Sequence, residues 1–261
     1  MIAVFGRQRS GTTVFRKLLA SSMLIYDAGE VFHSQYKNNK LNFFNFVETA
    51  LSADRMLLPE IFTHKAIVKF LQYVAAMQGK AQPMIDVKYN SNFDLFLTER
   101  LSGRAPTPPL LQALRMMQAR IFHIVRRNKL RLLVSERIAI ATNQWGVMDP
   151  DRRRQASIEL NPRVIHELIE EECLLSARVE RLIHDSGDGL TVFYEDMFDA
   201  SGRFAPALLA EVQDMLGPDT GLNAAPGLIR QNPEPLTELI RNHAAVAAAL
   251  RATPHAWMLE D

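Results

Sequence analysis

Residues 2–22 read IAVFGRQRSGTTVFRKLLASS and predict three consecutive pieces of structure. The apolar run Ile2–Phe5 predicts a buried strand, and Val14–Ser22, whose apolar residues recur every three or four positions, predicts an amphipathic helix. Between them lie Gly6 and Gly11, in a segment rich in hydroxyl and guanidinium groups. A strand, a glycine loop and a helix in this order are typical of a phosphate-binding loop, where backbone N–H groups and the positive helix end hold an anion.

Three further short apolar segments predict buried strands, and helical sequence separates each strand from the next. Such alternation favours a parallel sheet with crossover helices. We therefore expect an α/β, three-layer, P-loop-like fold with a central, mainly parallel sheet flanked by helices. The expected strands are Pro83–Tyr89, Arg120–Val125 and Leu190–Tyr194, and the clearest helices are Leu132–Gln144, the segment from Pro162 to Gly187, and Leu236–Leu250.

Chain length sets the expected domain organisation. The 261 residues suffice for one α/β domain with a full core, so we expect a single domain over residues 1–261. Residues 31–82 show helical spacing without a clear strand and predict a helical insertion. Residues 217–250 predict a proline-rich loop followed by the final helix.

Composition excludes several classes of protein. The 30 Lys and Arg residues balance 29 Asp and Glu residues, which argues against a nucleic-acid-binding protein. No apolar stretch approaches the roughly 20 residues that cross a bilayer, so we expect no membrane span. Cys173 is the only cysteine, which favours a reducing, cytoplasmic location.

The loop departs at one position from the nucleotide-kinase pattern G-x4-G-K-[ST]. Where that pattern has the lysine that reaches the β- and γ-phosphates, this chain has Thr12. The nearest cations are Arg7 and Arg9, which precede the second glycine. The loop is therefore expected to hold a different oxyanion, and the simpler alternative is a glycine turn with solvated arginines.

The segment RQRSGTT resembles the P-R-S-G-T-T signature of the sulfotransferases that use 3′-phosphoadenosine-5′-phosphosulfate (PAPS). In that family the loop cradles the 5′-phosphosulfate, and a basic residue two positions before the glycine replaces the kinase lysine. Gln8 stands where many members have proline. The resemblance implies cofactor binding by Arg7, Gln8, Arg9, Ser10, Gly11, Thr12 and Thr13.

A second motif resembles the 3′-phosphate site of the same family, which has an arginine at a strand end and a serine eight residues later. Arg127 and Ser135 have that spacing. Trp145 matches a tryptophan that commonly follows ten residues after the serine in the bacterial carbohydrate-type branch. Asn128 departs from the aspartate often found after the arginine. An arginine and a hydroxyl that converge on one phosphate would give directional, charge-assisted hydrogen bonds.

Two weaker resemblances follow in the expected order. Tyr194–Met197, YEDM, is similar to the family's Y-E-D-L, which caps a strand and which we interpret as structural. The C-terminal loop and helix resemble the segment that closes over the 3′-phosphate and adenine, and Arg230 is the candidate cofactor-binding residue there.

The catalytic candidates are Glu30, His33, Lys88 and Arg9. Gly29-Glu30-Val31-Phe32 resembles a G-E-x-F segment whose glutamate takes the proton of the acceptor hydroxyl, a role that a carboxylate with a raised pKa suits. His33 is the alternative base, since cytosolic small-molecule sulfotransferases use histidine. Lys88 ends an expected strand, where open α/β sheets place ligand groups. It would orient Glu30 or the sulfuryl group, or form a structural salt bridge.

The resemblance implies transfer of the sulfuryl group from PAPS to a carbohydrate or glycolipid hydroxyl, with release of adenosine 3′,5′-bisphosphate and no metal. A small-molecule or natural-product alcohol is the alternative acceptor. Two other classes stay open: a nucleotide-type kinase with Asp86 as a magnesium ligand, and a non-catalytic nucleotide-binding protein. Exposed aromatic helices would permit a homodimer. No metal-ligand spacing is found among His166, His184, His243 and His255.

Overall fold

The computed structural model describes residues 1–33, 41–53, 63–77, 79, 81–90, 107–146, 150–187, 189–217, 220–223, 225 and 231–260. The chain divides into two compact units. The first comprises Met1–Val125 and Val179–Ala225, and the second comprises Arg126–Arg178 and Pro226–Asp261. The expectation of a single domain stays a prediction.

The first unit is built on a five-stranded sheet in the order β2-β3-β1-β4-β5, in which all neighbouring strands run parallel. Every residue of the central strand β1 is buried, as expected for a parallel strand covered on both faces. The predicted α/β class with a central parallel sheet is confirmed. The strands are β1 Ile2–Gly6, β2 Ile25–Gly29, β3 Gln82–Lys88, β4 Arg120–Val125 and β5 Gly189–Phe193.

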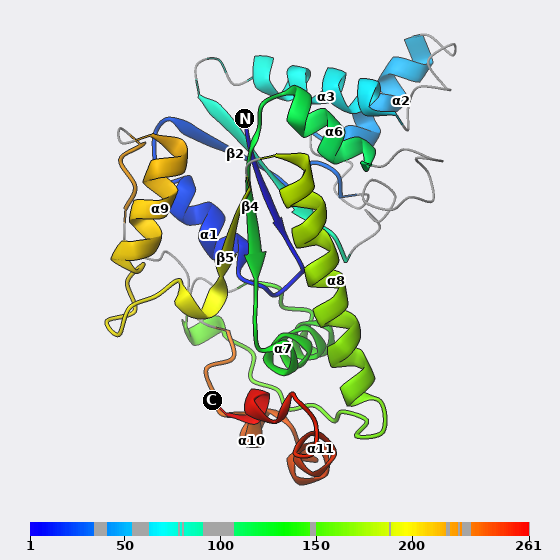
Figure 1. The fold of residues 1–261 in the computed structure, drawn as a ribbon, viewed down its shortest axis with the longest axis vertical. Helices are drawn as coiled ribbons and strands as arrows, with labels where there is room; N and C mark the ends of the chain where they lie inside the picture. The colour runs from blue at the N-terminus through cyan, green and yellow to red at the C-terminus, as the bar shows by residue number, and fades with distance from the viewer. Residues whose placement is uncertain are drawn as a thin grey trace. The chain divides into compact units, whose positions relative to one another are not determined.

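Helices flank this sheet on both faces (Figure 1). Helix α1, Thr12–Leu19, leads from β1 to β2, whereas α6, Pro109–Met116, leads from β3 to β4 in the opposite direction along the sheet. Because crossovers between parallel strands are right-handed, the two helices lie on opposite faces. Helix α9, Pro206–Leu216, lies on the α1 side, and α3, His64–Ala76, packs against α6 and β3.

The order of the strands indicates where a ligand site is expected at the carboxyl edge of the sheet. The chain leaves β1 toward one side of the sheet and leaves β4 toward the other side. Open α/β sheets bind ligands where the connections diverge in this way. That point lies between β1 and β4, and the glycine loop begins there.

Strand β2 is not predicted by the sequence. It pairs with β3 on one side only, and its register shifts between Asp27 and Gly29. Tyr26 is exposed and Asp27 half-buried, so the strand lacks the continuous apolar run of its neighbours. Between β2 and β3, within residues 31–82, the structure describes α2, Phe43–Ala53, and α3.

The second unit is helical and has its own apolar core. It contains α7, Lys129–Thr142, the first part of α8, Ile165–Ser186, and two short helices, α10, Leu236–Leu239, and α11, His243–Leu250. Helix α7 begins three residues earlier than predicted, because the Asn128 side chain accepts a hydrogen bond from the N–H of Arg131 and caps the helix. The core includes Leu130, Val134, Ile165, Ile169, Leu250 and Met258.

The predicted continuous helix over Leu236–Leu250 is wrong. The chain breaks at Ile240, which is fully buried and forms a parallel bridge with Ile158. The N–H of Ile158 donates to the carbonyl of Leu239, and the N–H of Arg241 donates to the carbonyl of Ile158, both at 2.9 Å. These bonds take backbone groups that a continuous helix would use internally.

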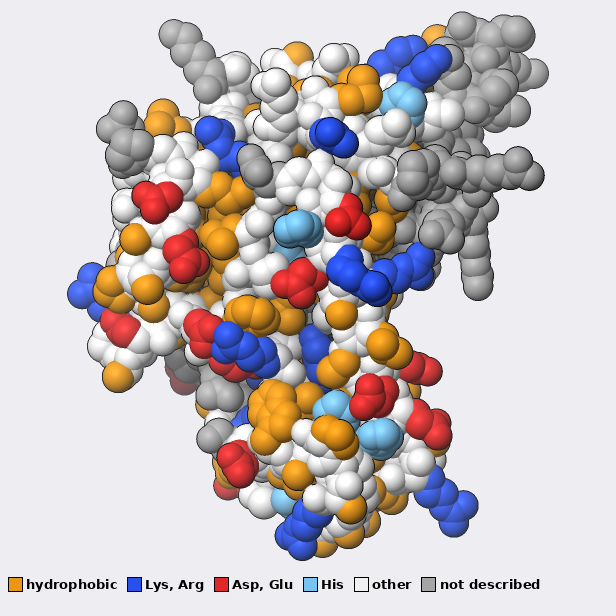
Figure 2. Space-filling model, viewed as in Figure 1, with side chains coloured by type: hydrophobic (Ala, Val, Ile, Leu, Met, Phe, Trp, Pro, Cys, Tyr) orange, Lys and Arg blue, Asp and Glu red, His pale blue; other side chains and the backbone are white. Residues whose placement is uncertain are grey.

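Two surface properties bear on the expected partners. None of the described helices combines the length and the apolar character needed to cross a membrane. On the face drawn in Figure 2, basic and acidic side chains are interspersed, in keeping with the net charge of +1.

Candidate functional site

The loop after β1 is tightly curled. A Cβ on Gly6 would lie 2.3 Å from Cγ2 of Thr12 and 2.7 Å from Oγ of Ser10, so only glycine allows this approach. The backbone N–H and the hydroxyl of Ser10 both donate to the carbonyl of Arg7, at 3.1 and 2.7 Å. Gly11 has φ of 99° and precedes α1 as its N-cap residue. The first-turn N–H groups of α1 therefore lie at the loop, as in other anion sites at helix ends.

The remaining loop residues differ in accessibility. Arg7 is 6% exposed, whereas Gln8 and Arg9 are half-buried and Thr13 is exposed. Arg9 has a left-handed backbone, with φ of 70°, which is uncommon outside glycine. The N–H of Gln8 donates to Oδ1 of Asn90 at 2.8 Å, which ties the loop to the residues that follow β3.

Tyr194 lies against the other side of the loop. A Cβ on Gly11 would meet Cδ2 of Tyr194 at 2.4 Å. The structural role predicted for the YEDM segment is consistent with this contact, because Tyr194 fixes the position of the loop at the start of α1.

Lys88 brings a cation to the loop from the neighbouring strand. Gly6 and Lys88 are paired in register, so the end of β3 lies beside the start of the loop. The ammonium of Lys88 donates to the hydroxyl of Thr12 and, at 2.6 Å, to both carboxylate oxygens of Asp86. The positive charge that the loop lacks at Thr12 is thus supplied by Lys88 of β3, whose ammonium contacts the Thr12 hydroxyl.

Arg16 and Asp27 complete a network of buried charges around Asp86. Nη1 of Arg16 pairs with Oδ2 of Asp86, and its Nε and Nη2 donate to the carboxylate of Asp27 at 2.7 to 3.2 Å. Burial works to lower the pKa of the Arg16 guanidinium, but the two carboxylates outweigh it and raise that pKa. Arg16 therefore stays charged and clamps α1 to β2 and β3.

Glu30 lies at the open end of this network. It follows β2, and its Oε1 is 4.0 Å from Nζ of Lys88, too far for a hydrogen bond. Burial raises the pKa of Glu30 above its usual range, and Asp86 adds to this, although Lys88, His33 and Arg16 act in the opposite direction. Asp27 and Asp86 pair directly with Arg16 and Lys88, whereas Glu30 lies 4.0 Å from Lys88 and combines partial burial with a raised pKa.

His33 belongs to the same turn as Glu30. Its N–H donates to the carbonyl of Glu30 at 3.1 Å, and its own carbonyl accepts from Nδ2 of Asn42 at 2.9 Å. Within the first unit, the structure thus places Lys88 against the loop, Glu30 beside Lys88, and His33 in the turn that carries Glu30.

Arg127 and Ser135 belong to the second unit. Arg127 is exposed directly before the N-cap of α7, and Ser135 is buried two turns into that helix. Oγ of Ser135 accepts a hydrogen bond from Nδ2 of Asn232 at 3.1 Å. Ser135 therefore contacts the segment that follows Arg230, although Arg230 itself lies outside the described residues.

Arg16, Asp27 and the role of Asp86 are not predicted from the sequence. One signal was available, since Asp86 and Lys88 are two residues apart on an expected strand and so share a face. Arg16 and Asp27 carry no such signal, because their pairing depends on the unpredicted strand β2.

Comparison with models of known protein families gives no match. Comparison with curated proteins likewise finds no similar chain.

Proposed function

We propose that the chain is a PAPS-dependent sulfotransferase that acts on a hydroxyl of a carbohydrate or glycolipid. The observation that carries the proposal is the position of Glu30. This carboxylate, with its raised pKa, lies 4.0 Å from Lys88, whose ammonium contacts Thr12 in the glycine loop. A potential base therefore lies beside a loop suited to an oxyanion, and the resemblance of RQRSGTT to P-R-S-G-T-T favours phosphosulfate as that anion.

The loop supports binding of the phosphosulfate. PAPS supplies a sulfuryl group joined to a phosphate leaving group. Backbone N–H groups of the loop and the N-terminal end of α1 would bind the anionic oxygens, and Arg9 would add a guanidinium. Lys88 would supply from β3 the positive charge that a kinase loop supplies at the position of Thr12.

Glu30 would act as the general base of the transfer. Its carboxylate would accept the proton of the acceptor hydroxyl while the hydroxyl oxygen forms a bond to sulfur. The bond between sulfur and the phosphate oxygen breaks, and adenosine 3′,5′-bisphosphate leaves with the electron pair. Lys88, near both Glu30 and the loop, would stabilise the charge on the leaving phosphate and keep Glu30 oriented. His33 is the alternative base.

The other parts of the proposal depend on the resemblance. Arg127, Ser135 and Arg230 would hold the 3′-phosphate, and the bacterial carbohydrate-type branch suggests a glycan or glycolipid acceptor. A small-molecule alcohol is the second choice. The single cysteine is the basis for proposing a cytoplasmic enzyme.

The occupied carboxylate of Asp86 weighs against the kinase alternative. Oδ2 of Asp86 accepts bonds from both Lys88 and Arg16, and Oδ1 accepts one from Lys88, so two cations already neutralise the buried carboxylate that a magnesium ion would need. This arrangement favours a transfer that does not place magnesium on Asp86.

The test compares wild type with Glu30→Gln. We expect the variant to lose at least about 100-fold in sulfuryl transfer from PAPS, the lower range for a general base. Binding of adenosine 3′,5′-bisphosphate, followed as the rise in thermal unfolding temperature, should stay within about twofold of wild type. Glu48→Gln, an exposed glutamate of α2, is the matched control and should keep full turnover.

Three outcomes would contradict the proposal. Unchanged turnover in Glu30→Gln would remove Glu30 from the mechanism. Stabilisation of the wild type by ATP with magnesium, but not by adenosine 3′,5′-bisphosphate, would favour the kinase class. Binding of the bisphosphate without any sulfuryl transfer would point to the non-catalytic alternative.

A further inference from the structure

A cluster of nitrogen and oxygen ligands lies in the second unit, apart from the residues discussed above. His166 and Glu170 are four residues apart on α8 and therefore lie on one face of the helix. Their neighbours Ile165 and Ile169 are fully buried in the core of the second unit. This packing fixes the rotation of the helix, so that the imidazole and the carboxylate project side by side.

The third member of the cluster comes from the end of the chain. Nε2 of His255 lies 2.6 Å from Oε1 of Glu170, although the two residues are 85 positions apart. The backbone N–H of His255 donates to Oγ1 of Thr253 at 3.2 Å, and its carbonyl accepts from the N–H of Met258 at 2.9 Å. His255 is thus held by its own turn, and its side chain is only 11% exposed.

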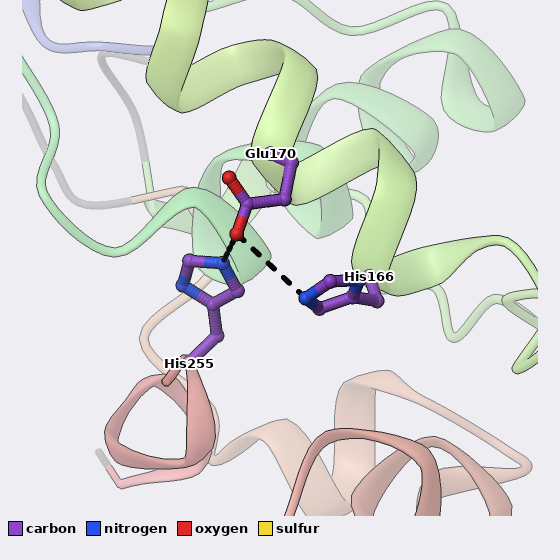
Figure 3. Close-up of side chains that lie close together, drawn as sticks. All are labelled: His166, Glu170 and His255. Carbon is purple, nitrogen blue, oxygen red and sulfur yellow. Dashed lines mark hydrogen bonds and ion pairs between the residues drawn. The ribbon is translucent and has the colours of Figure 1, made fainter. Parts of the chain in front are cut away.

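We propose that His166, Glu170 and His255 form a binding site for Zn²⁺ (Figure 3). One ligand atom from each residue lies within 4.8 Å of the other two. Nε2 of His166 is 3.7 Å from Oε1 of Glu170. Ligands bound tetrahedrally at the usual zinc distances lie about 3.4 Å apart, from bond lengths near 2.1 Å. The distance to His166 is therefore already close to that value, and the distance to His255 needs to widen by less than about 1 Å.

The ligand set favours zinc over magnesium or calcium. Two imidazoles and one carboxylate are ligands that zinc accepts, whereas magnesium and calcium prefer oxygen ligands. The side chains of His166 and Glu170 are each 43% exposed, so a water molecule can complete the coordination. In Figure 2, histidine and acidic side chains lie side by side on the visible face of the second unit, in keeping with access from solvent.

The site would connect α8 to the C-terminal segment. In the ion-free chain the hydrogen bond between His255 and Glu170 makes this connection. A zinc ion would replace that bond with three coordinate bonds and would bring His166 into the same link. A ligand that binds only the folded chain stabilises it by mass action, so zinc should raise the unfolding temperature of the second unit.

The experiment is a titration of the tag-free, full-length chain with ZnCl₂ after treatment with EDTA. Isothermal calorimetry should give one zinc per wild-type chain, and tryptophan fluorescence should show a higher unfolding temperature with zinc. His166→Gln removes a ligand but leaves the bond between His255 and Glu170 intact, so the variant should fold normally. Its zinc affinity should fall by more than the roughly 10- to 100-fold that loss of an outer-shell partner causes.

His184→Gln is the matched control. His184 lies on the same helix with a side chain that is 89% exposed, and the variant should bind zinc as wild type does. Equal loss of affinity in His184→Gln and His166→Gln would contradict the site. So would a wild-type chain that binds no zinc at micromolar concentration, in which case Glu170 and His255 form only a structural hydrogen bond. MgCl₂ should give no stabilisation at the same concentrations, and equal stabilisation by magnesium would also overturn the proposal.

Discussion

At the scale of single residues, the buried charges of the first unit depend on Lys88. Its ammonium binds both oxygens of Asp86, whose side chain is completely buried. Lys88→Met keeps a similar shape but leaves Asp86 with Arg16 as its cation. Breaking a buried ion pair costs about 3–5 kcal/mol. Because Arg16 remains as a partner of Asp86, we expect Lys88→Met to lower the free energy of unfolding by about 3 kcal/mol. Urea unfolding followed by far-UV circular dichroism measures this loss.

A double variant separates the lost charge pair from lost packing. Lys88→Met with Asp86→Leu removes both charges, and an apolar replacement of a whole buried pair is often close to neutral. Arg16 would keep Asp27 as its partner. We expect the double variant to regain at least half of the stability lost by Lys88→Met. A double variant less stable than Lys88→Met would contradict this account of the network.

At the scale of elements, the path from β1 into α1 depends on Gly11. Gly11→Ala places a side chain in a left-handed conformation, which costs about 1–2 kcal/mol. The new Cβ also collides with the ring of Tyr194, and such overpacking adds about 1–3 kcal/mol. Gly202 also has a positive φ, of 76°, but a Cβ there meets nothing within 4 Å. In urea unfolding, Gly202→Ala should therefore lower the free energy of unfolding only by the conformational cost of about 1–2 kcal/mol.

The ring of Tyr194 can be removed to test the steric part directly. In a Tyr194→Ala background, Gly11→Ala should cost no more than Gly202→Ala does in the wild type. If Gly11→Ala costs the same with and without the Tyr194 ring, the contact does not hold the loop.

The elements also show what a sequence can predict. Strands β1, β3, β4 and β5 are covered by neighbouring strands or helices, and each is therefore a short apolar run. The sequence predicts the bounds of each of these strands to within a residue or two. Strand β2 escapes prediction because an edge strand tolerates an exposed Tyr26 and needs Asp27 for its pairing with Arg16. The break at Ile240 depends on a bridge to Ile158, 82 residues earlier, which no local pattern indicates.

The same reasoning applies to the candidate sites. The residues of the glycine loop and Glu30 are contiguous motifs, so the sequence can predict them. The pairing of Asp86 with Arg16, and of Glu170 with His255, joins positions 70 and 85 residues apart. Such pairs become visible only when the strand register and the helix packing are known.

At the scale of the whole molecule, stability measurements must distinguish the two units. Trp145 and Trp257, the two tryptophans of the chain, both belong to the second unit. Tryptophan fluorescence therefore reports on that unit, and amide hydrogen exchange in β1 and β3 reports on the first. This division makes it possible to test how a charge in the first unit responds to pH.

Glu30 should make the first unit less stable as pH rises. Burial raises the pKa of Glu30 in the folded chain, whereas a glutamate in the unfolded chain has a pKa of about 4.3. Between these two values the folded chain holds a proton that the unfolded chain has released, so stability falls with rising pH and stays lower above the raised pKa. Glu30→Gln avoids this penalty. Hydrogen exchange in β1 and β3 should be slower in the variant than in wild type at pH 7, with the difference vanishing near about pH 4. Glu48→Gln should match wild type at both values. An equal difference at both pH values would mean that packing, and not the charge of Glu30, sets its contribution.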